Sequence, residues 1–167
     1  MNSLDEDEAL VFTVEDKRFA LPSSVVARVI RAVFVNPLPG APAMVMGIIN
    51  VHGEIVPVMN LRRRLGLPER EIEPDDQFIL ARESGRLVAL VCDHIEGLVP
   101  LSRSMITPIQ NLSPASEIIE GVIRIGSNLV LLQDLEAFLR PEENESLATA
   151  LSRRESEPST QSTGTAE

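Results

Sequence analysis

Few side chains in this sequence could carry out chemistry, and their spacing does not assemble a catalytic site. The chain has one cysteine and two histidines, with Cys92 and His94 two residues apart in "VCDHIEG". That spacing would put a thiol and its base on one face of a strand. However, Cys92 ends the apolar run "LVALVC", which is typical of a buried core thiol. With His52 there are three such side chains, fewer than the four ligands of a usual structural zinc site.

Charged side chains are equally poor candidates for catalysis. Asp75 and Asp76 precede a strand, where adjacent carboxylates point apart and serve turn formation. Arg62, Arg63 and Arg64 are expected on the solvent side of a short helix. The motifs GxxxxGK[ST], GxGxxG and GxSxG do not occur in the sequence,. The sequence therefore predicts a protein that is not an enzyme and that holds no metal or cofactor.

Composition and charge exclude several classes of partner. The sequence contains five Phe but no Trp or Tyr, which predicts an aliphatic core and argues against stacking on single-stranded nucleic acid,. Of the formal net charge of −10, residues 1–9 and 141–167 each carry −4, which leaves −2 on residues 10–140. Neither nucleic acid nor an anionic membrane is therefore expected as a partner. No apolar segment is long enough for membrane insertion and no signal peptide begins the sequence, which predicts a soluble cytoplasmic protein.

The same charge distribution divides the chain into three parts. Residues 1–9 are interpreted as an acidic N-terminal tail, 10–140 as one domain, and 141–167 as a disordered acidic C-terminal tail,. We expect both tails to contribute little to stability.

Between the tails, short apolar segments alternate with turn residues, which indicates a mainly β fold. Short helices are expected at 23–27, 61–65 and 134–139, with Asn60 as the N-cap of the second. The predicted strands are 10–14, 18–21, 26–35, 46–51, 54–59, 76–82, 86–93, 95–101, 121–126 and 128–133. Gly53 can adopt positive φ in the tight turn between 46–51 and 54–59. Pro57 cannot donate a hydrogen bond, which predicts an edge strand or a bulge.

Residues 47–62, "GIINVHGEIVPVMNLR", resemble the signature segment of the CheW family, the adaptors of bacterial chemosensory arrays. Gly47, Asn50, Gly53 and Pro57 match the family pattern in order, together with the apolar pairs around them. The resemblance extends through "FTVEDKRFALP", "VVARVI", "LVALVCDHIEGLVPL" and "IIEGVIRIGSNLVLLQDLEAFL", and so covers residues 10–140.

The resemblance implies two small five-stranded β-barrel subdomains that share an apolar core, with a few short peripheral helices. It also implies a non-enzymatic adaptor that couples the cytoplasmic tips of methyl-accepting chemoreceptors to the regulatory domain of a CheA-type histidine kinase. The kinase contact would be head-to-tail, and a receptor helical hairpin would dock on a groove wall. The implied receptor-binding residues are Val29, Arg31, Asn50, His52, Gly53 and Glu54, with Gly47, Pro57 and Asn60 as structural motif residues.

Two positions depart from the family pattern on this receptor wall. His52 stands where the family usually has Arg, and Val29 where it usually has Glu; these two charges could pair across neighbouring strands. Asn60 replaces the more usual Asp, and both residues cap helices well. Alternatives are a CheW-like scaffold for a non-flagellar pathway (pilus motility or other two-component signalling), a small-ligand-binding barrel and, last, an enzyme.

Overall fold

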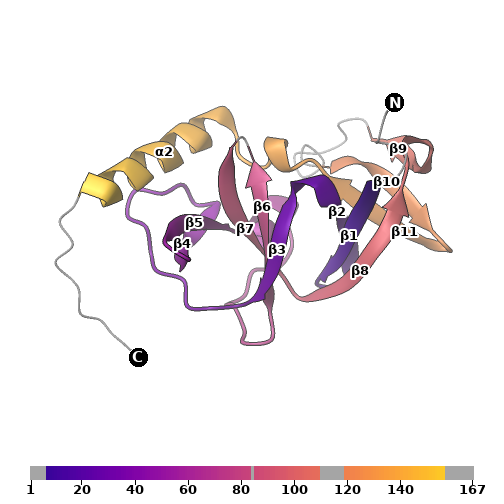
Figure 1. Ribbon diagram of the computed structural model, residues 1–167, viewed down its shortest axis with the longest axis horizontal. Helices are drawn as coiled ribbons and strands as arrows, with labels where there is room; N and C mark the ends of the chain where they lie inside the picture. The colour runs from indigo at the N-terminus through magenta and orange to yellow at the C-terminus, as the bar shows by residue number, and fades with distance from the viewer. Residues whose placement is uncertain (1–6, 84, 110–118, 157–167) are drawn as a thin grey trace.

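The computed structural model describes residues 7–83, 85–109 and 119–156, and these form eleven strands in two sheets (Figure 1). The strands are β1 (Asp7–Val14), β2 (Lys17–Pro22), β3 (Val26–Arg31), β4 (Val45–Val51), β5 (Glu54–Met59), β6 (Gln77–Glu83), β7 (Arg86–Cys92), β8 (His94–Leu101), β9 (Ile106–Pro108), β10 (Ile119–Ile125) and β11 (Asn128–Gln133). The helices are α1 (Leu61–Leu65) and α2 (Pro141–Ser156), with single 3-10 turns η2 (Ser23–Val25), η3 (Arg103–Met105) and η5 (Leu135–Ala137).

The two sheets correspond to the two predicted subdomains. The first sheet has the strand order β8-β1-β2-β11-β10-β9, and the second has the order β3-β6-β7-β5-β4. The mainly β fold with two barrel-like subdomains is therefore confirmed. The first sheet has six strands rather than five, because β9 pairs with β10 at its edge. Within the described residues the hydrogen-bonded order of each sheet stays open, so neither is a closed barrel.

Tight turns at the predicted positions connect consecutive strands. His52 and Gly53 have φ of 51° and 89°, so the β4–β5 hairpin has positive φ at both central residues, as a type I′ hairpin turn requires,. Glu15 begins the β1–β2 turn with φ of 60°. Short-range turn chemistry thus sets the register of both hairpins.

Central strands such as β1 and β6 are apolar on both faces, because apolar layers lie on both sides of them, whereas β3 and β8 carry exposed residues at alternating or paired positions. In β6, Ile79 faces a core shared by both sheets, whereas Phe78 and Leu80 face a second core confined to the second sheet. In β1, Phe12 faces the shared core and Val11 faces a third core inside the first sheet. The predicted shared apolar core is therefore confirmed.

Gly47 and Pro57 each occupy a position that few residue types could fill. A Cβ atom at Gly47 would collide with the carbonyl oxygen of Asn36 and come within 2.7 Å of Val35 Cγ1. Pro57 is buried and lies opposite Ile48, and β5 pairs with β7 only from Val58 onward. The sequence predicts an edge strand or a bulge here: β5 is interior, so the edge alternative is wrong, but a register shift between Val45 and Gly47 lies beside Pro57. Pro57 is tolerated because the parallel ladder with β7 begins after it,.

The first part of the expected C-terminal tail is the main departure from the predicted domain organisation. Residues 141–156 form α2, which lies along the second sheet (Figure 1) and buries Leu147 and Ala150 in the shared core. The expectation of disorder is therefore wrong for 141–156, while 157–167 lie outside the described residues. At the other end, β1 begins at Asp7, inside the expected tail. No helix in the described ranges has the length and apolar character to cross a membrane.

Candidate functional site

A network of buried and partly exposed charges joins the two sheets. Arg62 of α1 is 8% exposed, and its Nη2 donates to Asp93 Oδ1 and Oδ2 at 2.8 and 3.0 Å. Its Nη1 donates to a carboxylate oxygen of Glu15 in the β1–β2 turn and to the carbonyl of Pro68 at 3.0 Å. Burial acts to lower the pKa of Arg62, but the hydrogen bonds to Glu15 and Asp93 outweigh it and raise the pKa. One guanidinium thus ties a turn of the first sheet to the segment between β7 and β8.

A second arginine extends this network. Arg70 donates through Nη1 and Nη2 to the two carboxylate oxygens of Asp76, both at 2.8 Å, and through Nη2 to Asp93 Oδ1 at 2.9 Å. The Asp76 side chain is 3% exposed. Burial acts to raise the pKa of Asp76, but hydrogen bonds from Arg70 and the Glu73 amide outweigh it and lower the pKa. Every oxygen and nitrogen named here has a partner, so the network is structural rather than reactive.

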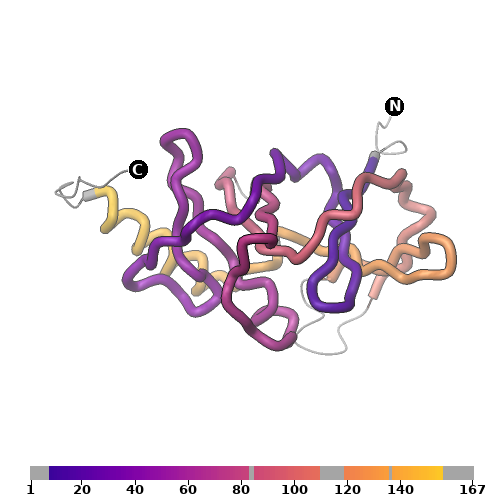
Figure 2. The backbone as a smooth tube through the Cα atoms, turned by 90° about the horizontal axis from the view of Figure 1, so that it is seen from below, coloured from indigo at the N-terminus to yellow at the C-terminus, as the bar shows by residue number. Residues whose placement is uncertain are grey.

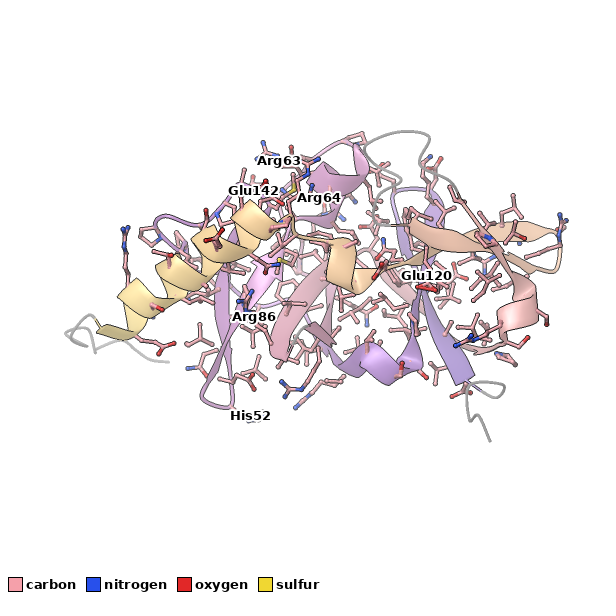
Figure 3. The ribbon with its side chains drawn as sticks, turned by 90° about the horizontal axis from the view of Figure 1, so that it is seen from above. His52, Arg63, Arg64, Arg86, Glu120 and Glu142 are labelled. Atoms are coloured by element: carbon pink, nitrogen blue, oxygen red, sulfur yellow. The ribbon has the colours of Figure 1, made fainter. Side chains whose placement is uncertain are left out.

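Arg64 makes a separate buried contact with α2. Its Nη2 donates to a carboxylate oxygen of Glu143, and its guanidinium lies 5.7 Å from the ring centroid of Phe138. Figure 3 shows Arg63 and Arg64 beside the start of α2. Only Arg63 of the three arginines is exposed, so the expectation of a solvent-facing triplet is wrong for Arg62 and Arg64. Their partners lie too far along the chain for sequence spacing to reveal them.

Cys92 and His94 do not form a nucleophile–base pair. Cys92 is completely buried at the end of β7, and burial raises the pKa of its thiol to about 12. A thiol with that pKa is protonated at neutral pH and is a poor nucleophile. His94 is exposed at the start of β8, so the two side chains lie on different strands. Among the described residues, no group of three potential ligands could hold a metal ion.

The β4–β5 turn brings together four of the six expected receptor-binding residues. Asn50 Oδ1 accepts a hydrogen bond of 2.7 Å from the Gly53 amide, which fixes the turn. His52 lies at the exposed tip of the hairpin, which projects from the body of the protein (Figure 3). Glu54 lies 3.8 Å from Arg82 Nη1, measured from its Oε2. The turn therefore presents a mixed polar surface at the tip of an exposed hairpin.

The other two expected residues, Val29 and Arg31, lie on β3. Val29 is half-buried against the shared core, and Arg31 is exposed. Strands β3 and β4 are not hydrogen-bonded neighbours in the order of the second sheet, but Asn36, beyond the end of β3, forms an antiparallel bridge with Ile48 of β4. The pairing of positions 29 and 52 stays a prediction. In Figure 2, β3 and the β4–β5 hairpin lie on the same side of the molecule. We call these two segments together the hairpin face.

An apolar groove lies next to this face, and the sequence did not indicate it. Phe34 is 77% exposed and Val33 48%, whereas the phenylalanines at 12, 19, 78 and 138 are at most 3% exposed. These two residues, with Ala32, Val35, Met46, Glu71, Ile72, Glu73 and Pro74, line a groove of about 510 Å³. Residues 26–35 were expected to be one strand, but β3 ends at Arg31. The Ala32 amide donates to the Asp76 carbonyl at 3.0 Å, and beyond this bond the chain no longer pairs with β6.

Comparison with known proteins identifies the family. The model of the CheW-like domain matches residues 8–143. Protein FrzA of Myxococcus xanthus is 31% identical over 74% of this chain and 78% of its own length. Chemotaxis protein CheW of Rhizobium meliloti (strain 1021) is 28% identical over 83% of this chain and 90% of its own.

A solved structure supports the same assignment at the level of the fold. The crystal structure of scaffolding protein TtCheW from Thermoanaerobacter tengcongensis has a TM-score of 0.76 and 22% sequence identity, and the match covers 83% of this chain and 95% of that one. The match of the family model over most of the sequence agrees with the two sheets and their shared core. This chain belongs to the family of proteins with a CheW-like domain.

Proposed function

We propose that this protein is a chemotaxis adaptor, a scaffold that couples chemoreceptors to a CheA-type histidine kinase. Family membership over residues 8–143 supports the adaptor role. The observation that carries the proposal is that an exposed hairpin face and an exposed apolar groove lie on one body, in which two sheets share a core. An adaptor needs two contact surfaces, each of which can be disrupted without loss of the other. The hairpin face and the groove meet that requirement. In this role the protein acts without catalysis, and its place is at the cytoplasmic tips of a receptor array.

In this proposal the hairpin face contacts the receptor. Asn50, His52, Gly53 and Glu54 form the tip of the β4–β5 hairpin, and Val29 and Arg31 belong to β3. Such a face suits a helical hairpin, which would lay apolar side chains against Val29 and polar ones against the turn.

The apolar groove around Phe34 contacts the kinase regulatory domain. Exposure of a large aromatic side chain beside half-buried apolar residues is typical of a binding hot spot, because covering it removes apolar surface from water. The acidic side chains of Glu71 and Glu73 line the same groove and would set the orientation of the partner,.

Substitution of Phe34 tests this assignment. The Phe34→Ser variant should bind the isolated kinase regulatory domain roughly tenfold or more weakly in isothermal titration calorimetry. Its binding to a receptor fragment should not change. Leu129→Ser is the matched control, because Leu129 is 58% exposed but belongs to the first sheet. If Phe34→Ser bound the kinase domain as tightly as Leu129→Ser does, the groove would not be the kinase contact.

A further inference from the structure

The groove around Phe34 combines an apolar floor with a negatively charged rim. The floor consists of half-buried side chains that pack against the core of the second sheet, namely Ala32, Val35, Met46 and Ile72. The rim consists of the exposed lining residues, and it carries the carboxylates of Glu71 and Glu73. Among the described residues that line the groove there is no Lys, Arg or His. A partner that fills the groove therefore meets apolar surface and negative charge together.

The negative charge of this rim is poorly compensated within the described part of the chain. Glu71 takes part in no ion pair there. Glu73 Oε1 lies 4.0 Å from Arg70 Nη1, and the Glu73 side chain is 63% exposed. Both terminal nitrogens of Arg70 already donate to Asp76, and one of them also donates to Asp93. Most of the charge of the rim is therefore left for a partner.

The charge of the rim restricts what can fill the groove. The exposed ring of Phe34 favours an apolar contact, because burial of a large aromatic side chain is typical of an interface anchor. The same contact would take the carboxylates of Glu71 and Glu73 partly out of water. Removing a charge from water without a partner for it is unfavourable, whereas a Lys or Arg on the other surface offsets that cost through charge-assisted hydrogen bonds. The groove thus suits an apolar surface that also carries positive charge.

We propose that the groove selects its kinase regulatory domain by charge: the docking surface presents an apolar side chain flanked by Lys or Arg, which pair with Glu71 and Glu73. The inference rests on the proposed kinase contact and adds the sign of the charge that this contact requires. A regulatory domain with acidic side chains at that place is rejected, since like charges brought together at an interface weaken binding. Phe34 is then the apolar anchor, and Glu71 and Glu73 determine which kinase is bound.

The test uses the full-length protein and the regulatory domain of the CheA-type kinase from the same organism. Binding is measured by isothermal titration calorimetry at low and high salt for the wild type, for Glu71→Gln/Glu73→Gln and for Glu71→Lys/Glu73→Lys. At low salt the glutamine variant should bind roughly fivefold more weakly and the lysine variant more weakly still. At high salt these differences should shrink, because salt screens exposed charges. The control is Glu145→Gln/Glu155→Gln, which removes two negative charges from exposed positions of α2, outside the groove.

The outcomes separate the charge of the partner from the contact itself. Because Glu71 and Glu73 are exposed, the variants should keep the melting temperature of the wild type and its affinity for a receptor fragment,. If the glutamine variant bound the regulatory domain as tightly as the control at low salt while Phe34→Ser still bound it weakly, the charge inference would be wrong and the kinase contact would stand. Tighter binding by the lysine variant would also contradict the inference, since it would show an acidic partner surface. If Phe34→Ser bound like the wild type, the groove would not be the kinase contact, and both claims would fail.

Discussion

Asp93 is the residue that most tightly connects the two halves of the protein. It accepts hydrogen bonds from Arg62, Arg70 and the Glu15 amide, the last at 2.8 Å. These donors come from α1, from the segment before β6 and from the β1–β2 turn. Arg62 and Asp76 are buried, so removal of one of their partners leaves a buried charge with fewer compensating contacts, and single substitutions at these positions should be costly,.

Asp76 gives this network a pH dependence with a definite sign. Its pKa in the folded protein is lower than in the unfolded chain, where an Asp titrates near about 3.9,. The stability that it contributes is therefore fully present above that value and is lost as the pH falls through the lower, folded pKa. Asp76→Asn should lower the free energy of unfolding by about 3 kcal/mol at pH 7. The difference from wild type should shrink below about pH 4.

Urea unfolding at several pH values measures this effect, with Asp75→Asn as the control. Asp75 is exposed at the adjacent position, so its substitution should change little at any pH,. A difference between wild type and Asp76→Asn that stayed constant from pH 7 to pH 3 would show that the ion pair is not its source.

Two glycines with positive φ differ in whether a new side chain would meet a neighbouring atom. Gly47→Ala should lower the free energy of unfolding by about 3 kcal/mol, because its Cβ atom would collide with the Asn36 carbonyl oxygen,. Gly53→Ala should cost only about 1 kcal/mol, because φ is 89° there but no atom lies within 4 Å of a new Cβ,. Equal costs in thermal unfolding would contradict the close approach of residues 36 and 47.

At the scale of elements, the sequence predicts features that depend on neighbouring residues and misses those that depend on residues far apart in the chain. The turn at His52-Gly53 and the Asn60 cap follow from neighbouring residues, and the structure confirms both: Asn60 Oδ1 accepts from the Arg63 amide at 3.0 Å. The burial of Arg62 depends on Glu15 and Asp93, which are 47 and 31 residues away in the sequence. Short-range reasoning could not anticipate such pairs.

The sequence of helix α2 contains an apolar helical pattern, but its charged residues favoured the interpretation as a tail. Its first turn is acidic, with Glu142 and Glu143, which made 141–156 resemble a solvated tail. Leu147, Ala150 and Leu151 are nevertheless spaced three and four residues apart, the spacing of one helix face,. Arg64 and the shared core fix that face in place.

Truncation after Arg140 should therefore destabilise the protein, because it uncovers part of the shared core. Leu147→Ala alone should lower the free energy of unfolding by about 3 kcal/mol, since Leu147 is completely buried,. Thr149→Ala, at an exposed position of the same helix, should change it little,. Chemical denaturation of the three proteins gives the comparison. A truncated protein as stable as the full chain would mean that α2 does not seal the core.

At the scale of the whole molecule, the sequence indicated the fold better than the contact surfaces. The family resemblance and the apolar strands predicted two β subdomains with a common core. The groove around Phe34 could not be predicted, because it depends on β3 ending at Arg31 and on segments 32–35 and 71–74 meeting in space. A surface formed by loops from separate parts of the chain can be identified only from the three-dimensional structure.

The central claim is that one rigid body holds a receptor and a kinase at the same time. The most direct test immobilises a chemoreceptor hairpin fragment and measures, by surface plasmon resonance, how much kinase regulatory domain it retains with and without this protein. We expect retention only when the protein is present, loss of retention with Phe34→Ser, and normal retention with Leu129→Ser. If the kinase domain and the receptor fragment competed for the protein instead of binding together, the adaptor account would be contradicted.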